Sequence, residues 1–190
     1  MIDDVEDALR RVVDVLEATG VPYMLTGSFA SAYYGQGRST QDIDFVIMPS
    51  RSQLRALLDQ LTMPKFYVVE RTAAEALEDR TQFNAIDHET FAKVDFIIQK
   101  ARSFSQTEFE RRIPRVVAGV PLMIASAEDV ILSKLEWAKL GESDRQIVDV
   151  RGILQVRWDQ LDKDYLARWV DALDLHEQWR RALEAAGLSD

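Results

Sequence analysis

The sequence contains no cysteine, only two histidines and no long apolar run. The lack of cysteine excludes disulfides, thiolate nucleophiles and zinc sites with cysteine ligands. The two histidines, His88 and His176, leave little basis for a zinc site or a histidine-based triad. No apolar run approaches the roughly 18 residues that a membrane span needs, and the first residues, MIDDVEDALRR, lack the apolar core of a signal peptide. We therefore expect a cytoplasmic protein without a membrane partner.

Positive charge is also scarce. Only 23 Lys and Arg residues stand against 32 Asp and Glu residues, which gives a formal net charge of −9. Contacts to phosphate need clustered Lys and Arg, so this balance weakens any broad affinity for nucleic acid and leaves only a local basic groove open. The eight glycines, five prolines and 47% hydrophobic residues argue against extended disorder. The chain can bury a core as one domain, or as one domain with a helical appendage.

The stretch from Tyr23 to Met48, YMLTGSFASAYYGQGRSTQDIDFVIM, organises the rest of the chain. Its first four residues predict a short strand, and Gly27-Ser28 turns the chain into a small-residue helix that ends at Gly35. A polar loop follows before the next strand. Because a helix N-terminus offers unpaired N–H groups and a positive dipole end, the start of this helix is a candidate phosphate site.

Asp42 and Asp44 open the strand that follows this loop. Side chains alternate between the two faces of a strand, so these two carboxylates point the same way. They repel each other unless a positive charge lies between them, and Mg²⁺ prefers carboxylate oxygens. Asp162 and Asp164 have the same spacing, but they stand at a predicted helix start, where acidic side chains cap N–H groups. Only the first pair is therefore a candidate metal site.

Asp95 is the third acidic candidate, within the apolar run Lys93-Val94-Asp95-Phe96-Ile97-Ile98. An unpaired carboxylate inside a buried strand is costly, so Asp95 needs a metal, a basic partner or solvent. The alternative to metal binding is a surface-facing or Lys-paired carboxylate on an edge strand. Three strand carboxylates could hold two divalent ions about 3.5–4 Å apart, which would clamp the attacking and leaving oxygens of a displacement at phosphorus.

The remaining pattern predicts an α+β fold, a mixed sheet flanked by helices with a C-terminal helical segment. Helices are expected over residues 3–19, 51–61, 72–79 and 104–112, and strands over 66–69, 82–87 and 91–99, with one or two more within 112–126. From residue 126 the period is helical, and helix N-caps are expected at Ser50, Ser126, Ser143, Asp162 and Asp174. We expect two parts, residues 1–125 and 126–190, the second packed on the first and held together by large Trp rings.

The order of Gly27-Ser28, a short helix, Asp42-Ile43-Asp44 and a lone Asp95 resembles the nucleotidyltransferase superfamily that includes DNA polymerase β. More narrowly, GSFASAYYGQGRSTQDIDFVI is similar to stand-alone bacterial members, of the abortive-infection toxin type and of the aminoglycoside- or lincosamide-modifying type. Their R-x-T-x-D-x-D segment is matched by Arg38, Thr40, Asp42 and Asp44. The resemblance covers residues 20–100 well, and SAEDVILSKLEWAK with RQIVDVRGIL looks more loosely like the family's tail.

The resemblance implies a nucleotidyltransferase-type sheet and a metal-dependent reaction. By it, Asp42 and Asp44 would bind two Mg²⁺ ions, with Mn²⁺ as the alternative. Asp95 would bind one of them and help to deprotonate the acceptor. The implied reaction is attack of an acceptor hydroxyl on the α-phosphorus of an NTP, with release of pyrophosphate.

The resemblance also implies a set of nucleotide-binding residues. Gly27 and Ser28 would hold the β- and γ-phosphates, while Arg38 and Lys134 would contact phosphate charge. Other interpretations stay open for each. Ser28 could serve only as a helix N-cap, Arg38 could be solvated, and Lys134 could extend to water or pair with Asp149.

The sequence leaves the acceptor open, as a small molecule, a protein or a tRNA end. It also leaves open a catalytically degenerate module, a nucleotide sensor or toxin–antitoxin partner, and a homodimer. One locally basic stretch is typical either of a triphosphate or RNA tract or, as we favour, of solvated helix and strand faces; its members are Lys100, Arg102, Arg111, Arg112 and Arg115.

Overall fold

The computed structural model describes residues 2–36, 42–61, 64–141 and 143–188. The chain forms two compact units. The first combines Met1–Thr26 with Thr40–Ile124, and the second combines Gly27–Ser39 with Ala125–Asp190. The second unit thus groups the segment 27–39 with the C-terminal helices.

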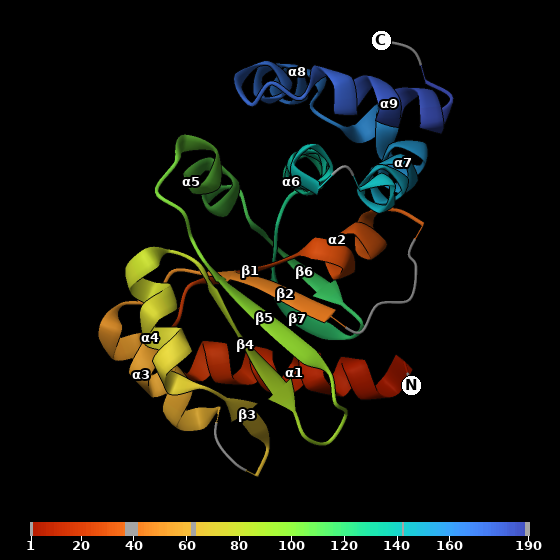
Figure 1. The fold of residues 1–190 in the computed structure, drawn as a ribbon. Coiled ribbons are helices and arrows are strands. Elements are labelled where there is room, and N and C mark those ends of the chain that lie inside the picture. The colour runs from red at the N-terminus through yellow and green to blue at the C-terminus, as the bar shows by residue number, and fades with distance from the viewer. Residues whose placement is uncertain (1, 37–41, 62–63, 142, 189–190) are drawn as a thin grey trace. The chain divides into compact units, whose positions relative to one another are not determined.

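A mixed sheet forms the centre of the first unit (Figure 1). Its strands, in the order in which they lie in the described part of the chain, are β3-β4-β5-β2-β1-β7-β6. The pairs β2–β5 and β1–β7 are parallel, and the other neighbours are antiparallel. The bounds are β1 Tyr23–Thr26, β2 Asp42–Ile47, β3 Phe66–Val68, β4 Gln82–Asp87, β5 Lys93–Ile98, β6 Ile113–Val117 and β7 Val120–Ile124. The predicted α+β class with a mixed sheet is confirmed.

One face of this sheet carries the core of the first unit. Phe45 of β2 stacks on Phe96 of β5 with ring centroids 6.3 Å apart, and Phe96 stacks on Phe83 of β4 at 5.0 Å. Three helices lie on one side of the sheet in Figure 1, namely α1 (Ile2–Ala18), α3 (Arg51–Gln60) and α4 (Glu70–Asp79). Because strand side chains alternate, the buried aromatic rings force the residues between them onto the opposite face.

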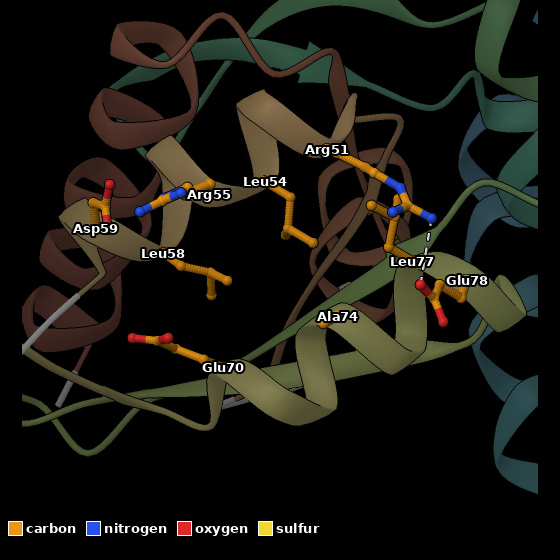
Figure 2. A pocket seen from close by; sticks show the side chains of 9 residues that line it. All are labelled: Arg51, Leu54, Arg55, Leu58, Asp59, Glu70, Ala74, Leu77 and Glu78. Atoms are coloured by element: carbon orange, nitrogen blue, oxygen red, sulfur yellow. Dashed lines mark hydrogen bonds and ion pairs between the residues drawn. The ribbon is translucent and has the colours of Figure 1, made fainter.

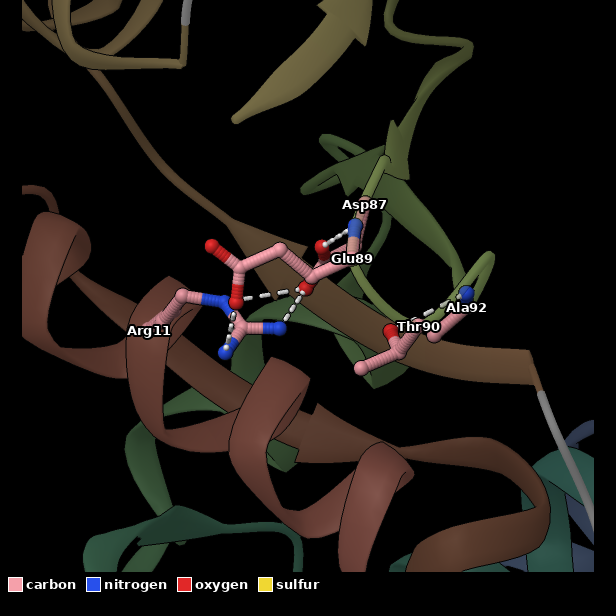
Figure 3. Close-up of polar contacts among 5 residues, drawn as sticks. All are labelled: Arg11, Asp87, Glu89, Thr90 and Ala92. Carbon is pink, nitrogen blue, oxygen red and sulfur yellow. Dashed lines mark hydrogen bonds and ion pairs between the residues drawn. The ribbon is translucent and has the colours of Figure 1, made fainter. Parts of the chain in front are cut away.

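An ion-pair cluster fixes α1 to the turn between β4 and β5 (Figure 3). The carboxylate of Asp87 is fully buried and accepts bonds from the Arg11 guanidinium, whose Nη1 also lies 3.1 Å from Glu89 Oε2. Asp87 Oδ1 also accepts a bond from the Glu89 N–H at 2.8 Å. A buried carboxylate is stable only when paired and hydrogen-bonded, and this one is. The cluster therefore orders the turn that leads directly into β5.

Helix caps follow local sequence rules in most places. Ser50 forms the predicted capping box with Gln53, and Asp162 accepts the bond of the Tyr165 N–H at 2.9 Å. Ser143 precedes α7 as predicted but makes no side-chain cap bond. The expected cap at Asp174 is wrong, because this residue has φ 53° and binds Lys139 Nζ at 2.8 Å, so the helix begins only at His176.

The second unit is helical. Its elements are α2 (Gly27–Tyr34), α6 (Ala127–Gly141), α7 (Asp144–Arg157), a 3-10 turn at Trp158–Gln160, α8 (Lys163–Ala172) and α9 (His176–Ala186). The remaining helix, α5 (Ser103–Glu110), belongs to the first unit.

Close backbone contact and aromatic stacking hold this unit together. A Cβ atom added at Gly35 would lie 2.6 Å from the backbone of Gly152 and Ile153 in α7, so only glycine fits there. Trp158 stacks on Trp179 with centroids 6.3 Å apart, as expected for the large rings of this segment. Within the described ranges, every helix is too short or too polar to cross a membrane.

Candidate active site

Two neighbouring strands place the acidic candidates on one face of the sheet. In the parallel register of β2 and β5, Asp44 lies opposite Asp95 and Asp42 lies opposite Lys93. These four residues alternate with the buried apolar residues of the same strands, so they share the opposite face. The sequence predicted that Asp42 and Asp44 share a face, and the register adds Asp95 to them.

The three carboxylates differ in exposure. Asp42 is exposed, Asp44 is half-buried and Asp95 is only 8% exposed. Asp95 lies on an interior strand between β2 and β4, so the edge-strand part of the alternative is wrong, but its carboxylate is paired with a lysine, as that alternative also held. Its buried Oδ1 has no hydrogen-bond partner among the described residues. A buried carboxylate oxygen of this kind is costly unless a further donor or a cation binds it.

Lys93 is the residue of this face that the sequence analysis did not assign to the site. Its Nζ donates to Asp95 Oδ2 at 2.7 Å, and its side chain is 44% exposed. The bond to Asp95 raises the pKa of the Lys93 ammonium; partial burial lowers it, and the charges of Asp42 and Asp44 add to the rise. The sequence alone could have indicated this ion pair, because residues two apart in a strand, such as Lys93 and Asp95, lie on the same face.

The site does not present a ready-made metal cluster. No group of three or more His, Cys, Asp or Glu residues in the described part of the chain is arranged to hold a metal ion. One carboxylate oxygen of the set, Asp95 Oδ2, is already engaged by Lys93. The donor set nevertheless suits a hard cation, since it consists of carboxylate oxygens with one of them, Asp95 Oδ1, unbonded within the described structure.

A second set of predicted residues comes together within the helical unit. Lys134 of α6 is 5% exposed, and its Nζ lies 2.7 Å from Asp149 Oδ2 of α7 and 3.4 Å from Ser28 Oγ of α2. Lys134 therefore does not extend to water, and Asp149 is its ion-pair partner. The chain enters α2 through Gly27, whose φ of 64° is a conformation that glycine adopts without strain. The positive charge of Lys134 thus lies at the start of α2, where an anion is favoured.

Thr26, the last residue of β1, lies opposite Asp44 in the antiparallel register of β1 and β2, and Gly27 is the next residue along the chain. Arg38 and Thr40, the other members of the matched segment, lie outside the described residues.

The basic stretch makes mostly local contacts. The Arg112 guanidinium lies 4.2 Å from the centroid of the Phe109 ring and also donates to the Phe109 carbonyl. Arg102 Nε donates to Ser105 Oγ at 3.0 Å, and Arg115 Nη1 donates to the Pro114 carbonyl at 2.9 Å. These contacts all lie within or next to α5 and β6.

A pocket of about 380 Å³ lies between α3 and α4 (Figure 2). Leu54 and Leu58 form part of its apolar wall, and an ion pair of Arg51 with Glu78, at 3.4 Å, lies at its rim. No predicted site residue lines it. Its charged lining mixes the basic Arg51 and Arg55 with the acidic Asp59, Glu70 and Glu78.

Comparisons with known proteins identify the fold. No protein-family model and no curated protein matches the sequence. Among solved structures, the crystal structure of ANT(2'')-Ia in complex with adenylyl-2''-tobramycin is 14% identical, covers 92% of this chain and 98% of that chain, and gives a TM-score of 0.61. An antigenic nucleotidyltransferase-like protein from Paracoccidioides brasiliensis is 17% identical, with 96% and 93% covered and a TM-score of 0.57.

The lincosamide antibiotic adenylyltransferase LnuA, with lincomycin bound, is also similar. It is 12% identical, covers 76% of this chain and 95% of that chain, and has a TM-score of 0.52. At such identities the likeness concerns the fold. The chain has a nucleotidyltransferase fold, as the sequence resemblance implied.

Proposed function

We propose that this chain, folded as a nucleotidyltransferase, is a metal-dependent enzyme that transfers NMP from an NTP to an acceptor hydroxyl and releases pyrophosphate. The observation that carries the proposal is the register of β2 and β5, which sets Asp44 opposite Asp95 with Asp42 on the same face. Carboxylates gathered in this way are unfavourable without cations. Transfer of a phosphoryl group is the chemistry that combines such carboxylates with cations and a polyanionic substrate.

In this proposal Asp95 acts on the acceptor. A carboxylate oxygen of Asp95 accepts the hydroxyl proton while the hydroxyl oxygen forms a bond to the α-phosphorus. The bond from the α-phosphorus to the bridging oxygen breaks, and its electron pair leaves with pyrophosphate. The proton then passes from Asp95 to solvent. Positioning of the hydroxyl next to the α-phosphorus supplies much of the rate enhancement, because it turns a bimolecular step into an effectively unimolecular one.

The start of α2 binds the triphosphate in this proposal. The Ser28 hydroxyl and the N–H groups of the first turn donate to the β- and γ-phosphate oxygens, and Gly27 allows close approach of the backbone. Lys134, held by its ion pair with Asp149, places an ammonium donor beside the Ser28 hydroxyl, where it can contact phosphate oxygens. Arg38 contacts phosphate in the same proposal, on the strength of its place in the sequence pattern.

Asp42, Asp44 and Asp95 are the residues that would hold two Mg²⁺ ions, with Mn²⁺ as the alternative, because their donor atoms are all carboxylate oxygens. When bound, such ions neutralise phosphate charge and stabilise the attacking and leaving oxygens. For the acceptor, a small molecule is favoured by the antibiotics bound to ANT(2'')-Ia and LnuA, and RNA is disfavoured by the net charge of −9. A protein side chain is the remaining class.

A nucleotide-binding module without catalysis is the second candidate. The ion pair of Lys93 with Asp95 favours it, since a lysine already engages the carboxylate that the reaction would use. Such a module would act as a nucleotide sensor or as the partner of an antitoxin.

Label transfer separates the two candidates. The protein is incubated with α-labelled ATP, CTP, GTP or UTP, Mg²⁺ and cell extract or purified acceptors, and transfer is followed together with pyrophosphate. The enzyme proposal expects transfer by the wild type, its loss in Asp44→Asn, and its retention in Asp164→Asn, a change in the exposed second D-x-D pair. Nucleotide binding without transfer in the wild type would support the module instead.

A further inference from the structure

Lys93 is placed where a cation would be expected in the proposed site. Its ammonium binds Asp95 Oδ2 at 2.7 Å, its backbone lies opposite Asp42, and the charges of Asp42 and Asp44 both act on it. The groups on the same face of the neighbouring strands are Asp42 and Asp44 on β2 and the exposed Asn84 and Ile86 on β4. Lys93 thus lies among three carboxylates, of which Asp95 is its hydrogen-bonded partner.

The ion pair with Lys93 provides a hydrogen-bond partner for only one of the two carboxylate oxygens of Asp95. Oδ2 holds the lysine, while the buried Oδ1 has no hydrogen-bond partner in the described residues. A purely structural ion pair in an interior strand would be expected to satisfy both oxygens, because an unpaired buried oxygen is costly. Here the second oxygen stays available to a further positive ligand.

We propose that Lys93 is an internal counter-cation, which neutralises part of the carboxylate cluster in the resting protein and competes with divalent cations for Asp95. The inference rests on the proposed function, because it concerns the same three carboxylates. With Lys93 in place, a bare divalent ion meets a site of reduced negative charge and must displace an ammonium from Oδ2. A cation that arrives with a triphosphate brings further contacts that offset this displacement.

The ligand of the resting site is therefore a complex of a metal ion and a triphosphate, and free ions bind weakly. Lys93 acts through Asp95 and so is a positioning residue. Its side chain can leave without unfolding the strand, since it is 44% exposed while its stem lies on the sheet.

Titration with Mn²⁺ alone tests the inference without any need for the acceptor. Free Mn²⁺ is followed by electron paramagnetic resonance for the full chain, for Lys93→Met and Lys93→Gln, for Lys93→Arg, and for Lys100→Met, which changes an exposed lysine just beyond β5. Thermal unfolding of each protein is recorded in EDTA and in Mn²⁺.

The expected result is that Lys93→Met and Lys93→Gln bind Mn²⁺ about tenfold or more tightly than the wild type, since one unit charge is removed at contact distance. Both variants should also unfold at lower temperature in EDTA and recover in Mn²⁺. Lys93→Arg and Lys100→Met should resemble the wild type.

Two outcomes would overturn the inference. If the wild type binds Mn²⁺ and the Met and Gln variants bind it equally or more weakly, Lys93 does not compete and only this inference fails. If no variant binds Mn²⁺ at all, the carboxylates are not a metal site, and the proposed function fails with it.

Discussion

Asp44 and Asp95 are direct neighbours across the parallel pair β2–β5, although half of the first unit's chain separates them in sequence. Parallel pairing brings equivalent positions of two distant strands together, so the two carboxylates lie side by side on one face. The half-exposed Asp44 and the buried Asp95 thus have different surroundings within the same cluster. We expect Asp44 to be mainly a ligand and Asp95 to contribute also to proton transfer.

Asp95→Asn separates binding from chemistry. The amide keeps the size of the side chain but accepts a proton poorly, so transfer should fall by about 10²-fold or more. Affinity for the NTP should change far less, because the phosphate contacts proposed for Ser28 and Lys134 remain. Equilibrium binding gives the affinity for the NTP and single-turnover kinetics give the rate of transfer, both measured on the same preparation. Equal losses in both would show that Asp95 acts only in binding.

Lys134→Met breaks the buried pair with Asp149. Both side chains are nearly inaccessible, at 6% and 5% exposure, so Asp149 would keep a charge without its partner. The free energy of unfolding should fall by about 3–5 kcal/mol, measured by denaturant titration. Lys139→Met is the matched control, because the Lys139–Asp174 pair is solvent-exposed and its loss should change stability little.

The double variant Lys134→Met with Asp149→Leu distinguishes a structural from a functional lysine. Stability should recover, since no buried charge is left, while transfer should stay low because the cation beside Ser28 is missing. Recovery of both stability and transfer would contradict a role of Lys134 in phosphate binding.

Gly35→Ala should loosen the contact between the end of α2 and α7. The added Cβ would lie 2.6 Å from backbone atoms of Gly152 and Ile153, which cannot rotate away. The expected loss in the free energy of unfolding is about 1–3 kcal/mol. Gly141→Ala, where a Cβ meets nothing within 4 Å, should be neutral or slightly stabilising in the same titration.

The environment of the Tyr23 phenol leads us to expect a loss of stability at alkaline pH. Burial, together with its 2.7 Å bond to Glu17, raises the pKa of the Tyr23 phenol above its ordinary value of 10.0. As the pH rises, the phenol of Tyr23 loses its proton in the unfolded chain before it does so in the folded chain. The contribution of this phenol to the free energy of unfolding is therefore fully present below about pH 10 and is lost as the pH rises through the folded-state pKa. The free energy of unfolding is measured by denaturant titration between about pH 8 and pH 11, a range that brackets the ordinary tyrosine pKa. It should decline less steeply with pH in Tyr23→Phe than in the wild type. Tyr67→Phe, at an exposed ring, should follow the wild type.

Local rules were enough to predict most of the fold. Period-2 and period-3.6 patterns gave the strands and helices, and the capping box at Ser50 is present because it depends only on neighbouring residues. The cap expected at Asp174 is absent because this residue has a φ of 53°, and its carboxylate accepts a bond from Lys139 of α6 instead of from the first turn of α9. A distant partner of this kind leaves no local signal.

The site was predictable in part. Asp42 and Asp44 follow from strand alternation, whereas the position of Asp95 depends on which strands are neighbours, a long-range property that no local pattern contains. The same holds for Lys134, because only the packing of α6 against α2 and α7 shows that it is buried beside Ser28. Lys93 could have been found by pairing side chains two residues apart on one strand.

The most direct test of the account is the location of Mn²⁺ by anomalous X-ray scattering in crystals grown with a non-hydrolysable NTP analogue. The account predicts anomalous peaks within coordination distance of Asp42, Asp44 and Asp95, with the ammonium of Lys93 displaced from Asp95. Bound analogue with no peak at these carboxylates, or peaks elsewhere, would contradict it.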